Sequence, residues 1–583
     1  MELINKIDFS KAAHLEKYKL DALSVPLMRL LKIDEVNKIY KNNCHLNGIE
    51  FINSILDELG IKIEIEENDL QNIPADGAFI AISNHPFGGI DGLILLKIFS
   101  SIRPDFKTMA NFLLSRIKSV ENYIIPVNPF DNSLANQSSL KGIKQTLECL
   151  QKGVPIGLFP AGEVSSFQMQ SKTIMDREWK PMIGKLITKA NVPVIPVHFS
   201  GTNSTLFNLL GFLNPNLRTV KLPSELFNKK GSVIKIRIGK PISQKRISTY
   251  TDNDQLVRFL RARTYAIGSD IEVKKFFNNP FQLPLKVEPI IAESNVNVLE
   301  NEVEKLKNTG AHLFSHDNYD LFAASHNQIP GILNEIGRLR EITFREVGEG
   351  TNKSIDIDEF DLYYSHLFMW DNAAKKIVGS YRIGKGNDIY RQFRNKGFYI
   401  NTLFKIDTGF VPYLKKSMEL GRSFIRKEYQ QKHLSLYLLW KGILVFLDQN
   451  KGYRYLIGPV SISNKYSKTS KALMIEMIKQ NYYDHDLAKL VTPRVKFKYN
   501  PAAVDTEILL KKNTDALKNL DDLIAEIEPS SYRIPVLLKK YLKQNAKIIG
   551  FNTDPKFSNA LDGFVIMDFE KIPMETLSML DKV

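Results

Sequence analysis

Short apolar runs recur along the first half of the chain, and each is followed by a stretch with helical character. The runs are GAFIAIS, NYIIPV, VPIGLFP, VPVIPVHFS and SVIKIRIG, which begin at residues 77, 122, 154, 192 and 232. Buried strands that alternate with helices are typical of an α/β domain, because the helices cover the apolar faces of a mostly parallel sheet. The pattern therefore predicts an α/β domain with a largely buried sheet.

Three other segments complete the predicted domain organisation. Residues 1–60, which include VPLMRLLKIDEVNKIY, predict a helical segment that either caps the α/β domain of residues 61–283 or lies on a bilayer. Residues 284–307 pass from proline-containing chain to a charged helix, so we expect a linker there. In residues 308–583, DLYYSHLFMWDNAAKKIVGSYRIG and YLIGPVSIS predict hairpins and amphipathic strands.

Charge narrows the possible partners. The net charge is +15, with 79 Lys and Arg against 64 Asp and Glu, which favours nucleic acid, a membrane surface or an acidic carrier protein as partner. Because the chain has no recognised nucleic-acid-binding motif, we expect no nucleic acid partner. The two cysteines, Cys44 and Cys149, form no CxxC pair and no cluster with histidines. We therefore expect a reducing cytosol and no metal site.

Two apolar stretches bear on membrane association. The first twenty residues alternate charged with apolar side chains, so they predict no signal peptide. The run LSLYLLWKGILVFL, residues 434–447, is interrupted by Lys441 and is shorter than the ~20 residues that a spanning helix needs. We expect a cytoplasmic protein with peripheral contact to the inner face of the cytoplasmic membrane.

The stretch NHPFGGIDG follows the first apolar run. A strand that ends at Ser83 brings His85 to the carboxyl edge of the sheet, where open α/β folds bind ligands. Gly88 and Gly89 permit a tight turn that lets Asp91 approach the imidazole. A carboxylate on one ring nitrogen leaves the other free to accept a proton from a hydroxyl. The alternative is a turn whose histidine only caps the next helix.

A second loop, GLFPAGEVSS at residues 157–166, also follows an apolar run and presents Glu163, Ser165 and backbone N–H groups that can bind oxygen anions. With the histidine stretch before it and VPVIPVHFSG after it, this loop resembles the glycerolipid acyltransferase family that includes the lysophosphatidic acid acyltransferases, over about residues 70–245. The resemblance implies that His85 and Asp91 form a catalytic dyad. It also implies a set of substrate-binding residues: Asn84, Gly88, Phe159, Pro160, Ala161, Gly162, Glu163 and Ser165.

The chain departs from that family in two places. Five residues separate His85 from Asp91, one more than usual, so a dyad requires a bulge that Gly88 and Gly89 can supply. Ala161 and Val164 stand where the family has a Glu and an Arg that help to bind phosphate. These departures favour an acceptor with a hydroxyl and no phosphate, such as a lipid with an amino-acid head.

In the second half, KKSMELGRSFIRKEY places Glu419 and Arg422 three residues apart. On a strand, Glu419 could accept a proton from an amine while Arg422 binds a carboxylate or phosphate through two hydrogen bonds. On a helix, the same spacing gives a surface ion pair. The spacing alone fits both structures.

The order of segments in this half resembles the ornithine-acyl-[acyl carrier protein] N-acyltransferases, also called hemolysin-like, of the GNAT superfamily. The matching segments are FREVGEG, DEFDLYYSHLFMWD, IVGSYRIG, MELGRSF, LLWKGI, YLIGPVSIS and IPVLLKKYLKQNAKIIGFNTDPKFSNALDGFVIMDF, within about residues 312–570. The region around Glu419 and Arg422 is also similar to the acyl-homoserine-lactone synthases. The resemblance implies a GNAT-like α+β domain that transfers a fatty acyl group, often 3-hydroxylated, to an α-amine, with Glu419 catalytic and Arg422 substrate-binding.

Together the halves resemble a bifunctional ornithine lipid synthase. The C-terminal domain would N-acylate an amino acid with a 3-hydroxyacyl group, and the N-terminal domain would O-acylate that hydroxyl. The scheme needs acyl carrier protein or coenzyme A thioesters as donors and no bound cofactor. Two alternatives are a lysophospholipid acyltransferase with a carrier-binding C-terminal domain, and a membrane-binding scaffold with degenerate sites.

Overall fold

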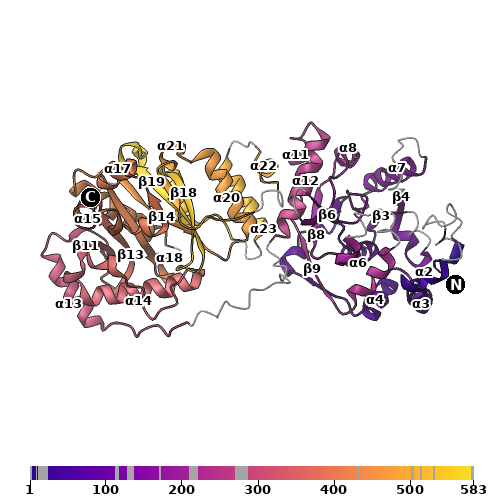
Figure 1. Cartoon of the computed structure of the whole chain (residues 1–583), viewed down its shortest axis with the longest axis horizontal. Helices are drawn as coiled ribbons and strands as arrows, with labels where there is room; N and C mark the ends of the chain where they lie inside the picture. Colours follow the sequence, from indigo (N-terminus) through magenta and orange to yellow (C-terminus); the bar gives the residue numbers. More distant parts are fainter. Residues whose placement is uncertain are drawn as a thin grey trace. The chain divides into compact units, whose positions relative to one another are not determined.

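The computed structural model describes residues 3–7, 10, 24–111, 117–127, 137–169, 173–208, 221–269, 287–430, 432–499, 505–511, 515–528 and 532–578. Part of the predicted N-terminal helical segment (residues 1–2, 8–9 and 11–23) and residues 284–286 of the predicted linker lie outside this set. The chain divides into two compact units (Figure 1). The first comprises Met1–Phe276, Asn500–Asn513 and Ala525–Ser531, and the second comprises Phe277–Tyr499, Thr514–Ile524 and Tyr532–Val583.

The first unit contains a 7-stranded sheet in the order β1-β9-β8-β2-β5-β3-β4. Its strands are β1 (Lys62–Ile65), β2 (Ile80–Ser83), β3 (Lys107–Asn111), β4 (Ile124–Val127), β5 (Ile156–Leu158), β8 (Val194–Phe199) and β9 (Val233–Ile238). β8 and β9 pair antiparallel, and the other neighbours pair parallel. Each of the five predicted apolar runs forms one of these strands. A separate hairpin joins β6 (Ser166–Gln168) to β7 (Thr173–Met175).

Helices surround this sheet. They are α2 (Ser24–Leu30), α3 (Ile33–Asn43), α4 (Gly48–Glu58), α5 (Glu67–Leu70), α6 (Gly89–Ser100), α7 (Gln137–Gln151), α8 (Pro181–Ala190), α11 (Gln244–Ile247), α12 (Asn253–Ile267) and α22 (Thr506–Leu509). The strand β2 is buried along its whole length, and its Ala81 packs in one apolar core with side chains of α4 and α6. Burial on both faces explains why the strands are short continuous apolar runs rather than alternating ones.

The second unit contains an 8-stranded sheet in the order β10-β11-β12-β13-β15-β16-β19-β18. Its strands are β10 (His312–His316), β11 (Tyr319–Ser325), β12 (Ser365–Asp371), β13 (Lys376–Lys385), β15 (Ser417–Ile425), β16 (Tyr455–Ile462), β18 (Lys547–Asp554) and β19 (Ala560–Asp568). Within this sheet, β15 and β16 pair parallel, and only through residues 417–419 and 455–457. Beyond this short ladder the two strands no longer pair with each other. A small second sheet joins β14 (Phe404–Ile406) to β17 (Val491–Pro493).

The helices of this unit include α13 (Val296–Lys307), α14 (Pro330–Val347), α15 (Gly386–Phe393), α16 (Ile400–Leu403), α17 (Val411–Lys415), α18 (Lys427–Gln430), α19 (His433–Gln449), α20 (Lys468–Asn481), α21 (His485–Ala488), α24 (Val536–Lys543) and α25 (Met574–Leu577), while α23 (Ala516–Ile527) has residues in both units. Within the predicted linker segment lies α13, which packs on α14 in the second unit through Leu299, Val303 and Leu306 (Figure 1). The apolar run at 434–447 lies in α19. No described helix is long and apolar enough to cross a membrane.

Candidate functional site

The end of β2 is fixed to β8 by one side chain. Asn84 Nδ2 donates to the carbonyl oxygen of Phe199 at 2.9 Å, and the Phe199 N–H donates back to Asn84 Oδ1 at 2.8 Å. Asn84 is buried, so both hydrogen bonds are shielded from water. Its side chain links neighbouring strands and holds the backbone from which His85 projects.

His85 and Asp91 are in contact. His85 Nδ1 lies 2.9 Å from Asp91 Oδ2, and the His85 side chain is 19% exposed while that of Asp91 is fully buried. With Nδ1 directed at a carboxylate, Nε2 is the nitrogen left to exchange a proton with a ligand. The structure thus brings together the two residues that the sequence proposed as a dyad.

The extra residue between them is accommodated by the turn that precedes α6. Gly88 has a φ of +100°, a backbone conformation that residues other than glycine rarely adopt. The backbone N–H groups of Phe87 and Gly88 both donate to Asp91 Oδ2, at 2.9 and 3.0 Å. The turn therefore accommodates the longer spacing. It places two backbone N–H donors around the Asp91 carboxylate, and the same carboxylate oxygen contacts the imidazole.

The loop after β5 lies beside this histidine. The Phe159 ring stacks on the His85 ring with 4.2 Å between centroids, and the Ser165 N–H donates to the His85 carbonyl at 2.8 Å. Glu163 forms an ion pair with Arg177 at 3.4 Å. Gly162 has a φ of +70°, and the loop contains two further predicted residues that are buried, Pro160 and Ala161.

Sequence reasoning missed Asp176, which joins the two loops. Its Oδ1 accepts from the His85 N–H at 3.1 Å and from the Ser165 hydroxyl at 2.5 Å, and its Oδ2 accepts from the Trp179 indole at 3.0 Å. Burial raises the pKa of this carboxyl, although these hydrogen bonds oppose the shift. Ser165 is thereby tied to protein, and Asp176 positions the backbone of His85. No local pattern around Asp176 indicates this contact.

In the second unit, the predicted pair lies on a central strand. The residues Glu419 and Arg422 belong to β15, so the ion pair on a surface helix is excluded. The register of β15 against β13 shifts between Ser380 and Arg382 of β13. Arg422 lies in this bulge with a φ of +49°, a strained conformation that is concentrated at functional sites.

Glu419 is buried and fully hydrogen-bonded. Its carboxylate accepts from the Tyr364 hydroxyl, from the Tyr399 N–H at 3.0 Å and from the Ile400 N–H at 2.6 Å. Burial raises the pKa of Glu419 to about 7, against the opposing effect of these hydrogen bonds. The side chain holds residues 399–400, at the start of α16, against β15.

Arg422 is held from several sides. Its Nε lies 3.0 Å from Asp356 Oδ2, its NH2 lies 3.5 Å from Asp358 Oδ2, and its NH1 donates to the Tyr399 hydroxyl at 3.1 Å. The guanidinium also lies over the rings of Tyr399 and Phe557, 4.9 and 5.1 Å from their centroids. Tyr399 thus connects the Glu419 region to the Arg422 guanidinium.

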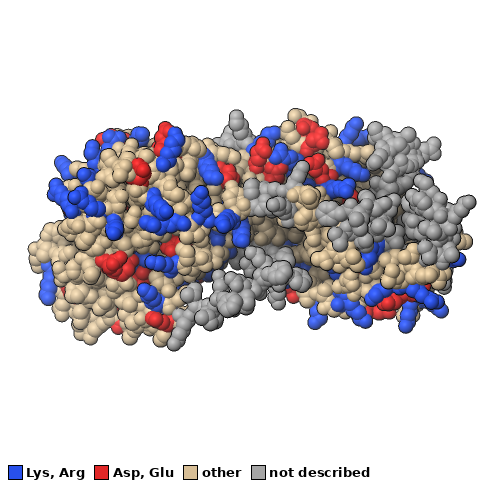
Figure 2. Space-filling model, viewed as in Figure 1, with Lys and Arg blue, Asp and Glu red and all other residues tan. Residues whose placement is uncertain are grey.

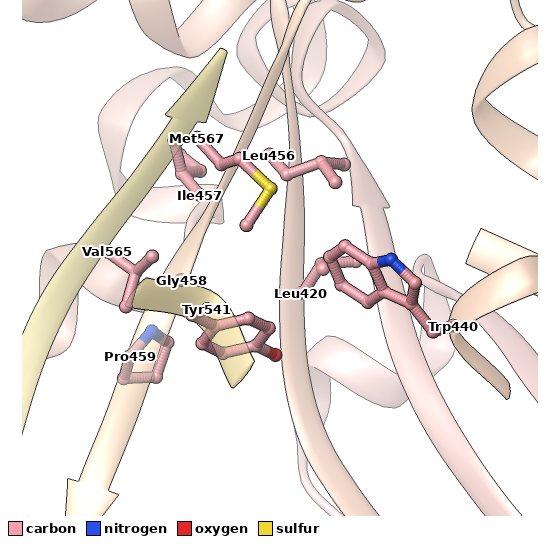
Figure 3. A pocket seen from close by; sticks show the side chains of 9 residues that line it. All are labelled: Leu420, Trp440, Leu456, Ile457, Gly458, Pro459, Tyr541, Val565 and Met567. Atoms are coloured by element: carbon pink, nitrogen blue, oxygen red, sulfur yellow. The ribbon is translucent and has the colours of Figure 1, made fainter. Parts of the chain in front are cut away.

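Two adjacent pockets open where β15 and β16 separate. The first spans about 270 Å³, part of which is open to solvent, and is lined mainly by apolar side chains. Figure 3 shows its lining: Leu420, Trp440, Leu456, Ile457, Gly458, Pro459, Tyr541, Val565 and Met567. Pro459 and Val565 lie on one side in this view, Trp440 lies on the other, and Tyr541 lies between them.

The second pocket spans about 540 Å³, part of which is open to solvent, and its lining is more polar. Its lining includes Tyr399, Arg422, Ser423, Ser461, Asp554 and Asp562, and it shares Leu420, Pro459 and Tyr541 with the first pocket. Arg422 therefore lines a pocket, whereas Glu419 is not among the residues that line it. The described residues contain no group of three or more His, Cys, Asp or Glu that could hold a metal ion.

Two family models match the chain. An acyltransferase model matches residues 3–273, and the model of an acetyltransferase (GNAT) domain matches residues 339–441. These matches confirm the predicted fold class, an α/β acyltransferase domain followed by a GNAT-like α+β domain. They also confirm the predicted enzyme class, so the chain is an acyltransferase.

Named relatives correspond to both domain types. A glycine N(alpha)-acyltransferase of Bacteroides thetaiotaomicron is 30% identical over 249 residues, which cover 40% of this chain and 72% of that protein. A lyso-glycine lipid O-acyltransferase of the same species is 27% identical over 247 residues, 41% of this chain and 87% of that protein. A solved 1-acyl-sn-glycerophosphate acyltransferase of Thermotoga maritima aligns at 18% identity over 36% of this chain and 78% of that chain, with a TM-score of 0.24.

Proposed function

Since this chain belongs to the family of the glycine N(alpha)-acyltransferase of Bacteroides thetaiotaomicron, we propose that it performs two successive acyl transfers that build an amino-acid lipid. The observation that carries the proposal is that one chain has relatives named for N-acylation of glycine and for O-acylation of a lyso-glycine lipid. The GNAT-like domain would acylate the amino group, and the N-terminal domain would acylate a hydroxyl of the product. Fusion raises the effective concentration of an intermediate at its second site where the linker allows both sites to be reached.

The amino acid of the first step is glycine in this proposal, in place of the ornithine that the sequence resemblance implies. Both named activities concern glycine. The donor is a 3-hydroxyacyl thioester, because only an acyl chain with a hydroxyl gives the second step an acceptor. The amine nitrogen attacks the thioester carbon, the new C–N bond forms as the C–S bond breaks, and the thiol leaves with a proton.

For this step we propose that the acyl chain occupies the apolar pocket between β15 and β16 and that Arg422 binds the carboxylate of the amino acid. The apolar lining suits a fatty chain, and a guanidinium can pair with a carboxylate through two hydrogen bonds. Glu419 is the catalytic residue proposed from sequence. Its contacts with the backbone at Tyr399 and Ile400 favour a positioning role, in which it holds Tyr399 against the Arg422 guanidinium.

In the second step, His85 would take the proton from the acceptor hydroxyl at Nε2 while Asp91 holds Nδ1. The hydroxyl oxygen attacks a second acyl thioester, an ester C–O bond forms as the C–S bond breaks, and His85 returns the proton to the thiolate, which leaves as a thiol. A positioned general base is worth typically about 10²- to 10⁴-fold in rate. The stacked Phe159 and the loop up to Ser165 would form one wall of the acceptor site. The buried Ala161 offers no charge for a phosphate, which favours an acceptor without one.

The positive surface charge supports the proposal that acyl carrier protein delivers the acyl group. The chain has a net charge of +15, and Lys and Arg are spread over the visible face of the second unit (Figure 2). An acidic carrier is attracted by such a surface. We further propose peripheral contact with the inner face of the cytoplasmic membrane, because the acceptor and the product of the second step carry fatty chains.

Lipid analysis tests the proposal. The full chain, His85→Gln and Arg422→Ala are expressed in a host that makes no amino-acid lipids, and lipids are measured by mass spectrometry. We expect a diacylated glycine lipid from the wild type, its mono-acylated precursor from His85→Gln and neither from Arg422→Ala. A folded wild type that yields no amino-acid lipid, yet acylates lysophosphatidic acid, would overturn the proposal in favour of a glycerophospholipid acyltransferase.

A further inference from the structure

Among the described residues that line the polar pocket of the second unit, Asp562 is buried and one of its carboxylate oxygens has no hydrogen-bond partner. Asp562 lies on β19, where it pairs with Ser461 of β16 and with Asn552 of β18. Asp562 is only 4% exposed. Its Oδ2 is buried and has no hydrogen-bond partner among the described residues. An unpaired buried carboxylate is costly to maintain, so its place in the lining of a pocket points to a ligand.

The surroundings of Asp562 favour a ligand with a positive charge at this point. Asp554 lines the same pocket, and burial, together with the carboxylates of Asp554 and Glu349, raises the pKa of Asp562. A cationic group placed among these side chains would relieve their mutual repulsion. Arg422 partly opposes this shift in the pKa of Asp562, but within the described part of the chain its ion pairs within 4.0 Å are with Asp356 and Asp358.

The same pocket offers a site for a negative charge. The Arg422 guanidinium also lines it, fixed in direction by its acidic partners and by the Tyr399 hydroxyl. A pocket that presents a guanidinium and an unpartnered carboxylate matches a zwitterion, whose carboxylate and ammonium need partners of opposite sign. The adjoining apolar pocket, which shares Leu420, Pro459 and Tyr541 with it, leaves the fatty chain a separate place.

We infer that Asp562 binds the α-ammonium group of the amino acid whose carboxylate binds Arg422, and that it accepts the proton which makes the amine a nucleophile. The inference rests on the proposed N-acylation. The proton moves from the ammonium nitrogen to Asp562 Oδ2, and the neutral amine attacks the acyl thioester. The C–N bond then forms while the C–S bond breaks. The thiolate leaves as a thiol when it takes the second proton of the nitrogen, and Asp562 returns its own proton to solvent.

The test compares the full-length wild type with Asp562→Asn, which keeps the size of the side chain and removes its charge. Binding of glycine and of glycolate, which has a hydroxyl in place of the ammonium, is measured by calorimetry, and N-acylation is measured with 3-hydroxyacyl carrier protein and glycine. We expect the wild type to bind glycine more tightly than glycolate. In Asp562→Asn, the ratio of these two affinities should fall at least 10-fold, and the N-acylation rate should fall at least 100-fold. A loss of folding alone would not change a ratio of two ligands.

Two further variants keep the inference falsifiable. Asp562→Glu retains the charge and should retain the preference for glycine even if its rate falls. Asp568→Asn, at the other end of β19 where Asp568 pairs with Arg454, should behave as the wild type. An unchanged preference and rate in Asp562→Asn, from a wild type that does make N-acylglycine, would overturn the inference alone, whereas a wild type that makes no N-acyl amino acid would overturn the proposed function itself.

Discussion

The imidazole of His85 and the carboxylate of Asp91 lie 2.9 Å apart, although one residue more than the family spacing separates them in sequence. If His85 is the base of the O-acyl transfer, His85→Gln should slow this transfer by about 10²- to 10⁴-fold and leave N-acylation unchanged. The two rates are measured separately, with a supplied mono-acylated lipid for the O-acyl step. His45→Gln, at an exposed position, serves as the control, and normal ester formation by His85→Gln would rule out the dyad.

The turn that closes this spacing depends on Gly88. The methyl group of an alanine there would lie 3.0 Å from Leu222 Cδ1, and the alanine backbone would have to adopt a φ of +100°. Gly88→Ala should therefore lower the stability by about 1–3 kcal/mol and slow O-acylation, because the Gly88 N–H holds Asp91. Gly89→Ala is the matched control, since a methyl group there meets nothing within 4 Å and alanine favours the helix. Equal melting temperatures for the two variants would contradict this account.

Asn84 was proposed from sequence as a substrate-binding residue, and its two hydrogen bonds with Phe199 support a structural role. Asn84→Ala would leave a buried N–H and a buried carbonyl unpaired, each at a cost of about 1–3 kcal/mol. We expect urea unfolding to detect this loss, while the exposed Asn42→Ala unfolds like the wild type. A stable Asn84→Ala with a raised KM for the acceptor would instead support substrate binding.

The sequence predicts those features of this molecule that are formed by residues close together in the chain. Five apolar runs between helices indicate the first sheet, and a glycine-rich corner indicates the histidine and aspartate that meet there. The positions of Asp176 and Asp562 could not be predicted in this way, because each acts on residues far away in sequence: Asp176 on His85, 91 residues distant, and Asp562 in a pocket with Arg422. Only the pairing of β15 with β13 and β16 decides between strand and helix for Glu419.

Burial raises the pKa of Glu419 to about 7 in the folded protein, from its ordinary value of 4.5. The folded state then binds more protons than the unfolded state between these pH values, so stability should fall as pH rises from about 4.5 to 7 and level off above that range. Glu419→Gln should weaken this part of the pH dependence. Thermal unfolding from pH 5 to 8 measures this pH dependence of stability, and Glu428→Gln at the surface is the control. Identical stability profiles for the wild type and Glu419→Gln would contradict the raised pKa of Glu419.

Arg422 is the residue for which a conservative change should be most informative. Lysine keeps the charge, but it cannot match the planar guanidinium that reaches Asp356 and the Tyr399 hydroxyl together and lies over two rings. Arg422→Lys should therefore raise the KM for glycine by about 10-fold or more, in line with the loss of one strong charge-assisted hydrogen bond. O-acylation of a supplied mono-acylated lipid should not change. Arg454→Lys, in a partly exposed ion pair with Asp568, is the control. An unchanged KM with a lower kcat would show that Arg422 positions its neighbours and does not bind the amino acid.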